Sequence, residues 1–226
     1  MPNLGCRKLH YLLRKTLLES GHTALGRDRL FALLRAKNML ILRKRKYAIT
    51  TNSNHQFKVY KNLILDKVIT RKNQVWVSDI TYVKTKQGFS YISLITDAYS
   101  RKIVGYHASN SLELTGCVNA YKMAIKNGNP EIHHSDRGSQ YCSHVYTGLV
   151  KKYGTKISMA AAGNCYENAL AERINGILKH EFNLNAKFEN LKHVRKALEQ
   201  AVKVYNEKRP NWALNLKVPN EVFFAA

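Results

Sequence analysis

The spacing of apolar residues divides the chain into a helical first part and a longer part that begins with strands. Residues 7–20 (RKLHYLLRKTLLES) carry leucines at helical spacing and end in the turn-like triplet Ser20-Gly21-His22. Leucines repeat this spacing between residues 30 and 34, and a break follows at Lys37 and Asn38. We predict two short amphipathic helices joined by a tight turn, the arrangement with which a helix-turn-helix lays one helix against DNA.

From Gln74 the apolar period becomes that of strands, with Val, Ile, Tyr and Thr enriched between turn signals. The order of elements predicts an α/β fold, a mixed five-stranded sheet flanked by helices, whose first three strands form an antiparallel meander. The predicted strands are 74–83, 89–96, 102–109, 131–135 and 155–159, and the predicted helices are 112–127, 143–153, 164–182 and 189–206.

We expect three parts along the chain: a basic helical DNA-binding module over 1–50, a linker over 51–73, and a catalytic core with a helical tail over 74–226. The linker begins in a polar stretch, residues 50–61, that has few large apolar side chains.

The net charge of the chain indicates what kind of partner it binds. The chain has 37 Lys and Arg against 15 Asp and Glu, a net charge of +22, and residues 1–75 hold 17 of the basic and three of the acidic side chains. A polyanion is the leading interpretation, and a ribosomal or merely cationic surface protein is the alternative. The basic run Arg43, Lys44, Arg45 and Lys46 either contacts DNA or forms a solvated surface; charge alone does not decide between them.

The remaining composition narrows the setting. The four cysteines, Cys6, Cys117, Cys142 and Cys165, form no Cys-x-x-Cys pair, which favours small buried thiols in a reducing compartment. No apolar run approaches the ~20 residues that span a bilayer, and no secretory signal opens the chain. We expect no membrane association and a location inside the cell, in the cytoplasm.

Three acids interrupt apolar or tightly ordered stretches. Asp79 lies in the middle of the first predicted strand, where Asp is disfavoured. Asp136 follows the short fourth strand, and Gly138 lets the chain turn away behind it. A salt bridge is the alternative role for Asp79, and a plain Asp turn is the alternative for Asp136.

Glu172 belongs to a helix whose faces can be projected. At about 100° per residue, Asn168, Glu172, Asn175 and Lys179 share a narrow arc, opposite Leu170, Ile174 and Ile177. A solvated face would favour Lys, Glu and Gln over short amides, so we expect a polar face with a function. Gly176 in this helix suggests close approach by another backbone or by nucleic acid.

Oxygen donors from two strands and a helix suit Mg²⁺ or Mn²⁺. Two such ions about 4 Å apart activate the attacking oxygen and stabilise the leaving oxygen in phosphodiester chemistry. Asp97 is interpreted as a turn residue that pairs with Arg101 or the backbone. His133 and His134 lack partners at zinc-ligand spacing; we expect packing and surface roles, and one of them is a candidate to support Asp136.

These motifs resemble the integrase-type catalytic core of DDE transposases, specifically the second-frame product of the insertion-sequence-three family. The resemblance covers nearly the whole chain, including the segment from Gly26 to Tyr47. Its motifs are WVSDITY at 76–82, TDAYSRKIVG at 96–105, HSDRGSQY at 134–141, NALAE at 168–172 and YNEKRP at 205–210.

The resemblance implies an RNase H-like fold with Asp79, Asp136 and Glu172 as the metal-binding triad and Lys179 as a contact to transposon-end DNA. It implies cleavage at transposon ends and transfer of the 3′-hydroxyl into double-stranded target DNA. A homo-oligomer and a first-frame transposon protein, or a fused segment, are the expected protein partners. The chain departs from the family pattern at Asn211, where histidine is common, and at Lys217-Val218-Pro219, which replaces the usual Thr-Pro.

Two other functions remain open at this point. One is an RNase H-like nuclease that hydrolyses without joining ends, and the other is a non-catalytic DNA-binding regulator of transposition.

Overall fold

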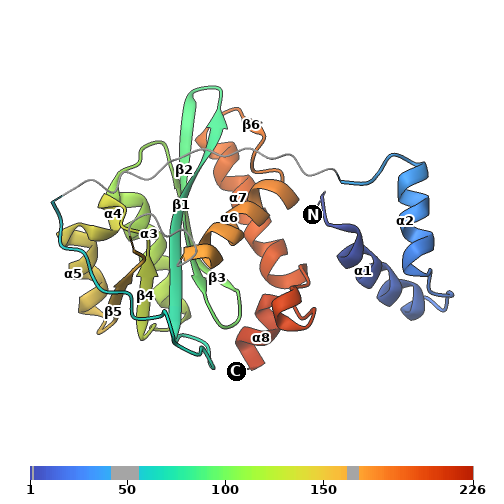
Figure 1. Cartoon of the computed structure of the whole chain (residues 1–226). Helices are drawn as coiled ribbons and strands as arrows, with labels where there is room; N and C mark the ends of the chain where they lie inside the picture. Colours follow the sequence, from blue (N-terminus) through green and yellow to red (C-terminus); the bar gives the residue numbers. More distant parts are fainter. Residues whose placement is uncertain (2, 42–55, 162–167, 226) are drawn as a thin grey trace.

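The computed structural model describes residues 1, 3–41, 56–161 and 168–225 (Figure 1). Its strands are β1 (Val75–Thr85), β2 (Gly88–Asp97), β3 (Ile103–Ser109), β4 (Ile132–Ser135), β5 (Lys156–Met159) and β6 (Lys187–Phe188). Its α-helices are α1 (Cys6–Glu19), α2 (Arg27–Ala36), α3 (Leu114–Ala124), α4 (Ser139–Cys142), α5 (His144–Lys152), α6 (Ala169–Glu181), α7 (Leu191–Lys208) and α8 (Pro219–Ala225), and short 3₁₀ turns cover Ile125–Asn127 and Trp212–Leu214.

The strands form one mixed sheet in the order β3-β2-β1-β4-β5. β1, β2 and β3 are antiparallel neighbours, which confirms the predicted meander, and β4 and β5 add to it in parallel. The expected count of five strands was wrong by one, because β6 pairs with the end of β1. A two-residue strand is too short to show an alternating pattern in the sequence.

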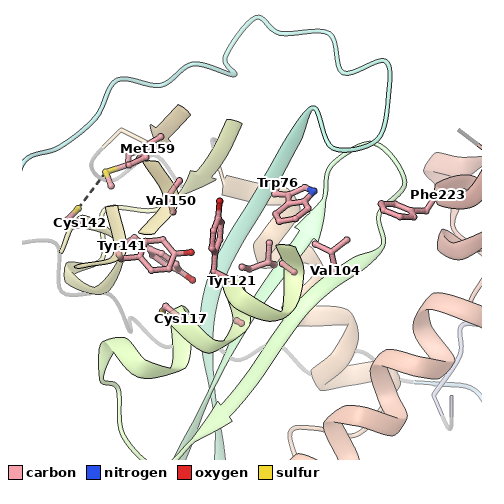
Figure 2. Close-up of a cluster of buried hydrophobic side chains, with 14 residues drawn as sticks. Trp76, Val104, Cys117, Tyr121, Tyr141, Cys142, Val150, Met159 and Phe223 are labelled. Carbon is pink, nitrogen blue, oxygen red and sulfur yellow. Dashed lines mark hydrogen bonds between the residues drawn. The ribbon is translucent and has the colours of Figure 1, made fainter. Parts of the chain in front are cut away.

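Helices cover both faces of the sheet (Figure 1). α3, α4 and α5 enclose a core rich in aromatic side chains, in which Trp76 and Tyr121 meet edge to face (Figure 2). Gly105 in β3 permits close approach of α3, since a Cβ there would lie 2.2 Å from the Ala120 carbonyl oxygen. α6 and α7 pack on the opposite face against residues such as Leu94.

This two-sided packing fixes the direction of the side chains in β1. Trp76 belongs to the core under α3, whereas Val75 and Val77 pack with Ala171 of α6. Because side chains alternate along a strand, Asp79 lies on the α6 side of the sheet.

The chain ends in three helices rather than the predicted two, because α8 follows α7. Phe223 of α8 is buried at the edge of the core cluster that contains Trp76 and Val104, and this contact holds the short helix in place (Figure 2). The α4 turn was also missed, since four residues carry no helical period.

The N-terminal part contains the two predicted helices, α1 and α2, and Asn38 with φ of 54° ends the second. The run Arg43 to Lys46 lies outside the described residues. Residues 56–73 form no helix or strand but lie on the core, where Tyr60 and Ile64 pack.

The described cysteines Cys6, Cys117 and Cys142 are free thiols, the last two buried as expected, while Cys165 lies outside the described part. No helix among the described residues is long and apolar enough to cross a membrane.

Candidate active site

Asp79 and Asp136 are neighbours across the parallel pair β1 and β4. In this register Val77 lies opposite His134, and Asp79 and Asp136 each follow two residues later. The register therefore places the two acids side by side, where β4 has ended and β1 continues. The two carboxylates also interact electrostatically, because the charge of Asp136 raises the pKa of Asp79.

The turn after β4 orients Asp136. The backbone N–H of Gly138 donates to Asp136 Oδ1 over 3.0 Å, so the Asp turn considered from the sequence is formed. Gly138 has an ordinary φ of −60°, and its role is space: a Cβ would lie 3.1 Å from Asp136 Oδ1. The carboxylate thus has one oxygen held by the backbone.

Two asparagines attach α6 to β1 and carry Glu172 between them. Asn168 Nδ2 donates to the carbonyl oxygen of Ser78 over 3.2 Å, and Asn175 Nδ2 donates to Asp79 Oδ2 over 2.7 Å. Both amides are buried and Glu172 is exposed. The polar face predicted for this helix is therefore directed at β1 over most of its length, which explains its short amides.

The opposite face of α6 packs against the core, as expected, but the most buried residues are not all the ones that we predicted. Ala171, Ile174 and Leu178 are buried, while Leu170 and Ile177 are only half-buried. Lys179, one turn beyond Asn175, has its Nζ 4.6 Å above the ring of Tyr82 and interacts with the charge of Asp79. The described residues give Asp79 no ion pair within 4 Å, so the salt-bridge alternative is not supported there.

Burial and like charge make the carboxylates weak acids. Burial, followed by the charge of Asp136, raises the pKa of Asp79 to about 7, and the hydrogen bonds from Asn175 and the Ile80 N–H oppose this rise. Burial and Asp136 also raise the pKa of Glu172. The three acids form one electrostatic cluster whose ionised form needs a cation.

Coordination geometry is not preformed. Within residues 3–41, 56–161 and 168–225, no group of three His, Cys, Asp or Glu side chains lies close enough to hold a metal ion. Two buried amide oxygens, Asn168 Oδ1 and Asn175 Oδ1, have no hydrogen-bond partner among the described residues.

The other candidates have structural roles. Asp97 is fully buried, and its carboxylate accepts from the N–H and hydroxyl of Ser100 and from the N–H of Asn73, which confirms the expected backbone pairing. His133 and His134 are packing residues, bonded to Tyr146 and Ser158. The expected surface role was wrong because β4 is covered on both faces.

The family follows from comparison with known sequences. Two profiles of the integrase core domain family match residues 69–165 and 153–219. A 31 kDa protein of insertion element IS600 from Shigella sonnei is 40% identical over 204 residues, which cover 87% of this chain and 74% of that protein. The chain belongs to the integrase-core family of insertion-sequence transposases.

Two transposases extend this assignment. The transposase of IS629 from Shigella sonnei is 40% identical over 63% of this chain, and InsF of IS3A from Escherichia coli K12 is 34% identical over 66% of it. The matches cover 49% and 54% of those two proteins, so the chain spans about half the length of each. The resemblance drawn from the sequence motifs is confirmed.

Solved integrase structures share the fold of this transposase-family chain. The HTLV-2 integrase catalytic core, solved in complex with magnesium, aligns with a TM-score of 0.56 at 20% identity, covering 68% of this chain and 97% of that one. The integrase intasome of simian T-cell lymphotropic virus aligns with a TM-score of 0.59 at 18% identity, covering 97% and 74%. The predicted RNase H-like fold is confirmed.

Proposed function

We propose that this chain cleaves DNA at transposon ends and transfers the exposed 3′-hydroxyl into target DNA, with Asp79, Asp136 and Glu172 as its metal-binding residues. The placement of Asp79 supports this proposal most strongly. Its carboxylate is half-buried beside Asp136, next to the point where β4 ends, and Asn175 of α6 orients it. Such a placement destabilises an ordinary core, and it suits a site that binds a cation.

The residues present fit Mg²⁺ or Mn²⁺. Their donors are carboxylate oxygens, and the buried amide oxygen of Asn175 lies in the same cluster without a hydrogen-bond partner among the described residues. We propose two ions at this site. When bound, such ions activate the attacking oxygen and stabilise the leaving oxygen of the phosphodiester.

The protein contributes orientation to this chemistry. Asn175 and the Ile80 N–H hold both oxygens of Asp79, and Gly138 holds one oxygen of Asp136. Glu172 is the exposed acid of the three and can turn toward the other two from one helical turn before Asn175. Removal of any one of these carboxylates should leave the fold intact and the reaction impaired.

The proposed partners are double-stranded DNA at the transposon ends and at the target, a second copy of this chain, and a first-frame transposon protein. Lys179 is the proposed contact to transposon-end DNA beside the carboxylates. The basic run Arg43, Lys44, Arg45 and Lys46 is the proposed anchor in the N-terminal part, and its replacement should reduce the salt dependence of DNA binding.

A strand-transfer assay with pre-cleaved transposon ends tests the proposal. Asp79→Asn, Asp136→Asn and Glu172→Gln should each lower Mg²⁺-dependent transfer by at least about a hundredfold while DNA binding persists. Asp66→Asn, a change of an exposed acid, is the matched control. Full transfer by any of the three variants would remove that residue from the site.

The same assay separates the other two functions. A nuclease would hydrolyse the DNA in Mg²⁺ without joining ends, and a regulator would bind DNA and catalyse neither step.

A further inference from the structure

A second cationic feature lies away from the carboxylates, in a cavity of about 520 Å³ next to the β2–β3 turn. Three segments far apart in the sequence line it: the approach to β1, the turn after β2, and the loop before α8. Its polar lining consists of Lys67, Tyr99, Arg101, Asn215 and Lys217, and no Asp or Glu is among the described residues that line it.

Arg101 is one of the cationic residues that line this cavity. Its Nε is buried and has no hydrogen-bond partner among the described residues. Asp97, four residues earlier, interacts with the charge of Arg101, but its carboxylate accepts hydrogen bonds from Ser100 and Asn73 and none from Arg101 Nε. A guanidinium remains charged in proteins, and an unpaired buried donor is costly, so Arg101 is arranged for a ligand that the chain does not supply.

The backbone at Arg101 is held independently of its side chain. Its N–H donates to the Asp97 carbonyl, and its own carbonyl accepts from the Tyr205 hydroxyl over 3.0 Å. Its φ of 64° is a left-handed conformation that glycine adopts without strain and arginine does not. An arginine at such a position is there for its side chain rather than for the turn.

We infer that this cavity binds a backbone phosphate of DNA. Guanidinium and ammonium groups beside a hydroxyl and an amide are the donors that phosphate oxygens accept from. Arg173 adds positive charge close to Arg101, and it follows Glu172 directly on α6. A net charge of +22 favours a polyanion over a carboxylate of a protein partner.

The cavity lies near the start of β1, where the backbone N–H of Ala98 donates to the carbonyl oxygen of Val75. Asp97 faces Trp76 across β1 and β2, three residues before Asp79, and Ala98 packs with Ala171 on the α6 side of the sheet. The cavity is therefore about 10–15 Å from Asp79, the axial rise of about three to four base pairs. The inference rests on the proposed function, because it takes DNA as the substrate.

The test measures equilibrium binding of the full chain to a short DNA duplex over a range of NaCl, in EDTA, where no reaction occurs. Arg101→Gly should lower affinity about tenfold and reduce the slope of log K against log[salt] by about 0.9, the release expected from one phosphate. Lys217→Gln, at an exposed position, should change the slope in the same direction and guards against misfolding of the first variant.

Lys122→Gln on α3, exposed on the other side of the sheet, is the control for general loss of charge, and its slope should equal that of the wild type. If Arg101→Gly and Lys217→Gln bind with the wild-type slope, the phosphate site is wrong, and a changed oligomeric state in those variants would then assign the cavity to a protein carboxylate. The two proposals can fail separately. If the wild type showed no strand transfer but Arg101→Gly still had a reduced salt slope, the proposed function would be contradicted and the phosphate site would stand.

Discussion

Asp79 is the residue whose position and pKa bear most directly on the proposed chemistry. It occupies a strand position on the packed side of the sheet, beside a second acid, and its pKa is about 7 as a result of burial and of Asp136. An ionisable group with this pKa is half charged at neutral pH until a cation neutralises the cluster.

The stability of the metal-free protein should therefore depend on Asp79 and pH. Because its folded pKa lies above the unfolded value near 3.8, the folded state binds more protons between about pH 4 and 7. The Asp79 contribution to the free energy of unfolding should fall as pH rises through this interval, by at most about 1.4 kcal/mol per pH unit. In EDTA, urea titrations should show Asp79→Asn gaining stability relative to wild type as pH rises. Parallel pH profiles of the two proteins would contradict this assignment.

Asn175 is a positioning residue for Asp79. Its amide favours the ionised carboxylate, so Asn175→Ala should raise the Asp79 pKa further and shift the rising limb of the transfer rate to higher pH. We expect about a tenfold loss of transfer at neutral pH, larger than the loss at high pH. Asn185→Ala, at an exposed position just after α6, is the control and should leave the pH profile of transfer unchanged. A uniform loss at all pH values in Asn175→Ala would indicate a merely structural role.

At the scale of elements, α6 carries the site and contains a glycine that the protein interior does not require. A Cβ at Gly176 would meet no protein atom within 4 Å among the described residues, so close approach by another backbone, one of the two sequence-based alternatives, is not found there. Close approach by nucleic acid remains the prediction.

Two glycine variants test it. Gly176→Ala and Gly148→Ala in α5 should each stabilise a helix by about 1 kcal/mol, since both sites have open space. Only Gly176→Ala should weaken DNA binding if DNA passes close to α6, measured on the same duplex by anisotropy. Equal DNA affinities of the two variants would leave Gly176 without a role in binding.

The elements themselves were largely predictable from the sequence. β1, β2 and β3 are each seven or more residues long and rich in Val, Ile, Tyr or Thr, and α7 repeats its apolar residues over 18 residues, so all four elements were recognisable. β6, α4 and α8 were missed because two to seven residues carry little period. Which face of α6 meets β1 was not predictable either, since the Asn175 amide became informative only when its partner Asp79 was placed.

At the scale of the whole molecule, one ion cluster connects parts that are distant in sequence. Glu181 at the end of α6 forms a two-bond pair with Arg209 after α7 and a 3.5 Å pair with Lys8 of α1, and Asn3 donates to the carbonyl of His180 nearby. Arg209 is only 3% exposed. The N-terminal helices are therefore joined to the core at the end of the helix that carries Glu172.

Removing different members of this cluster should lower the free energy of unfolding by unequal amounts. Glu181→Ala leaves Arg209 buried and unpaired, and we expect a loss of about 3 kcal/mol in the free energy of unfolding. Lys8→Ala removes only the longer bond and leaves the Glu181–Arg209 pair intact, so it should cost less than Glu181→Ala. Urea denaturation checks both values, and equal losses would contradict the central place of Arg209.

The site residues likewise differ in how far the sequence could predict them. Asp79 and Asp136 were visible in the sequence because an acid inside or just after a strand is out of place, whereas the cavity around Arg101 was not, because it joins three segments whose proximity only the fold creates.

Anomalous diffraction from crystals of the full chain grown in Mn²⁺ would show whether the carboxylates bind the catalytic metal. We expect a peak between Asp79 and Asp136 at about 2.0–2.3 Å from their oxygens, with Glu172 turned toward it, and no peak in Asp79→Asn. Mn²⁺ bound only elsewhere, or bound undiminished in that variant, would contradict this expectation.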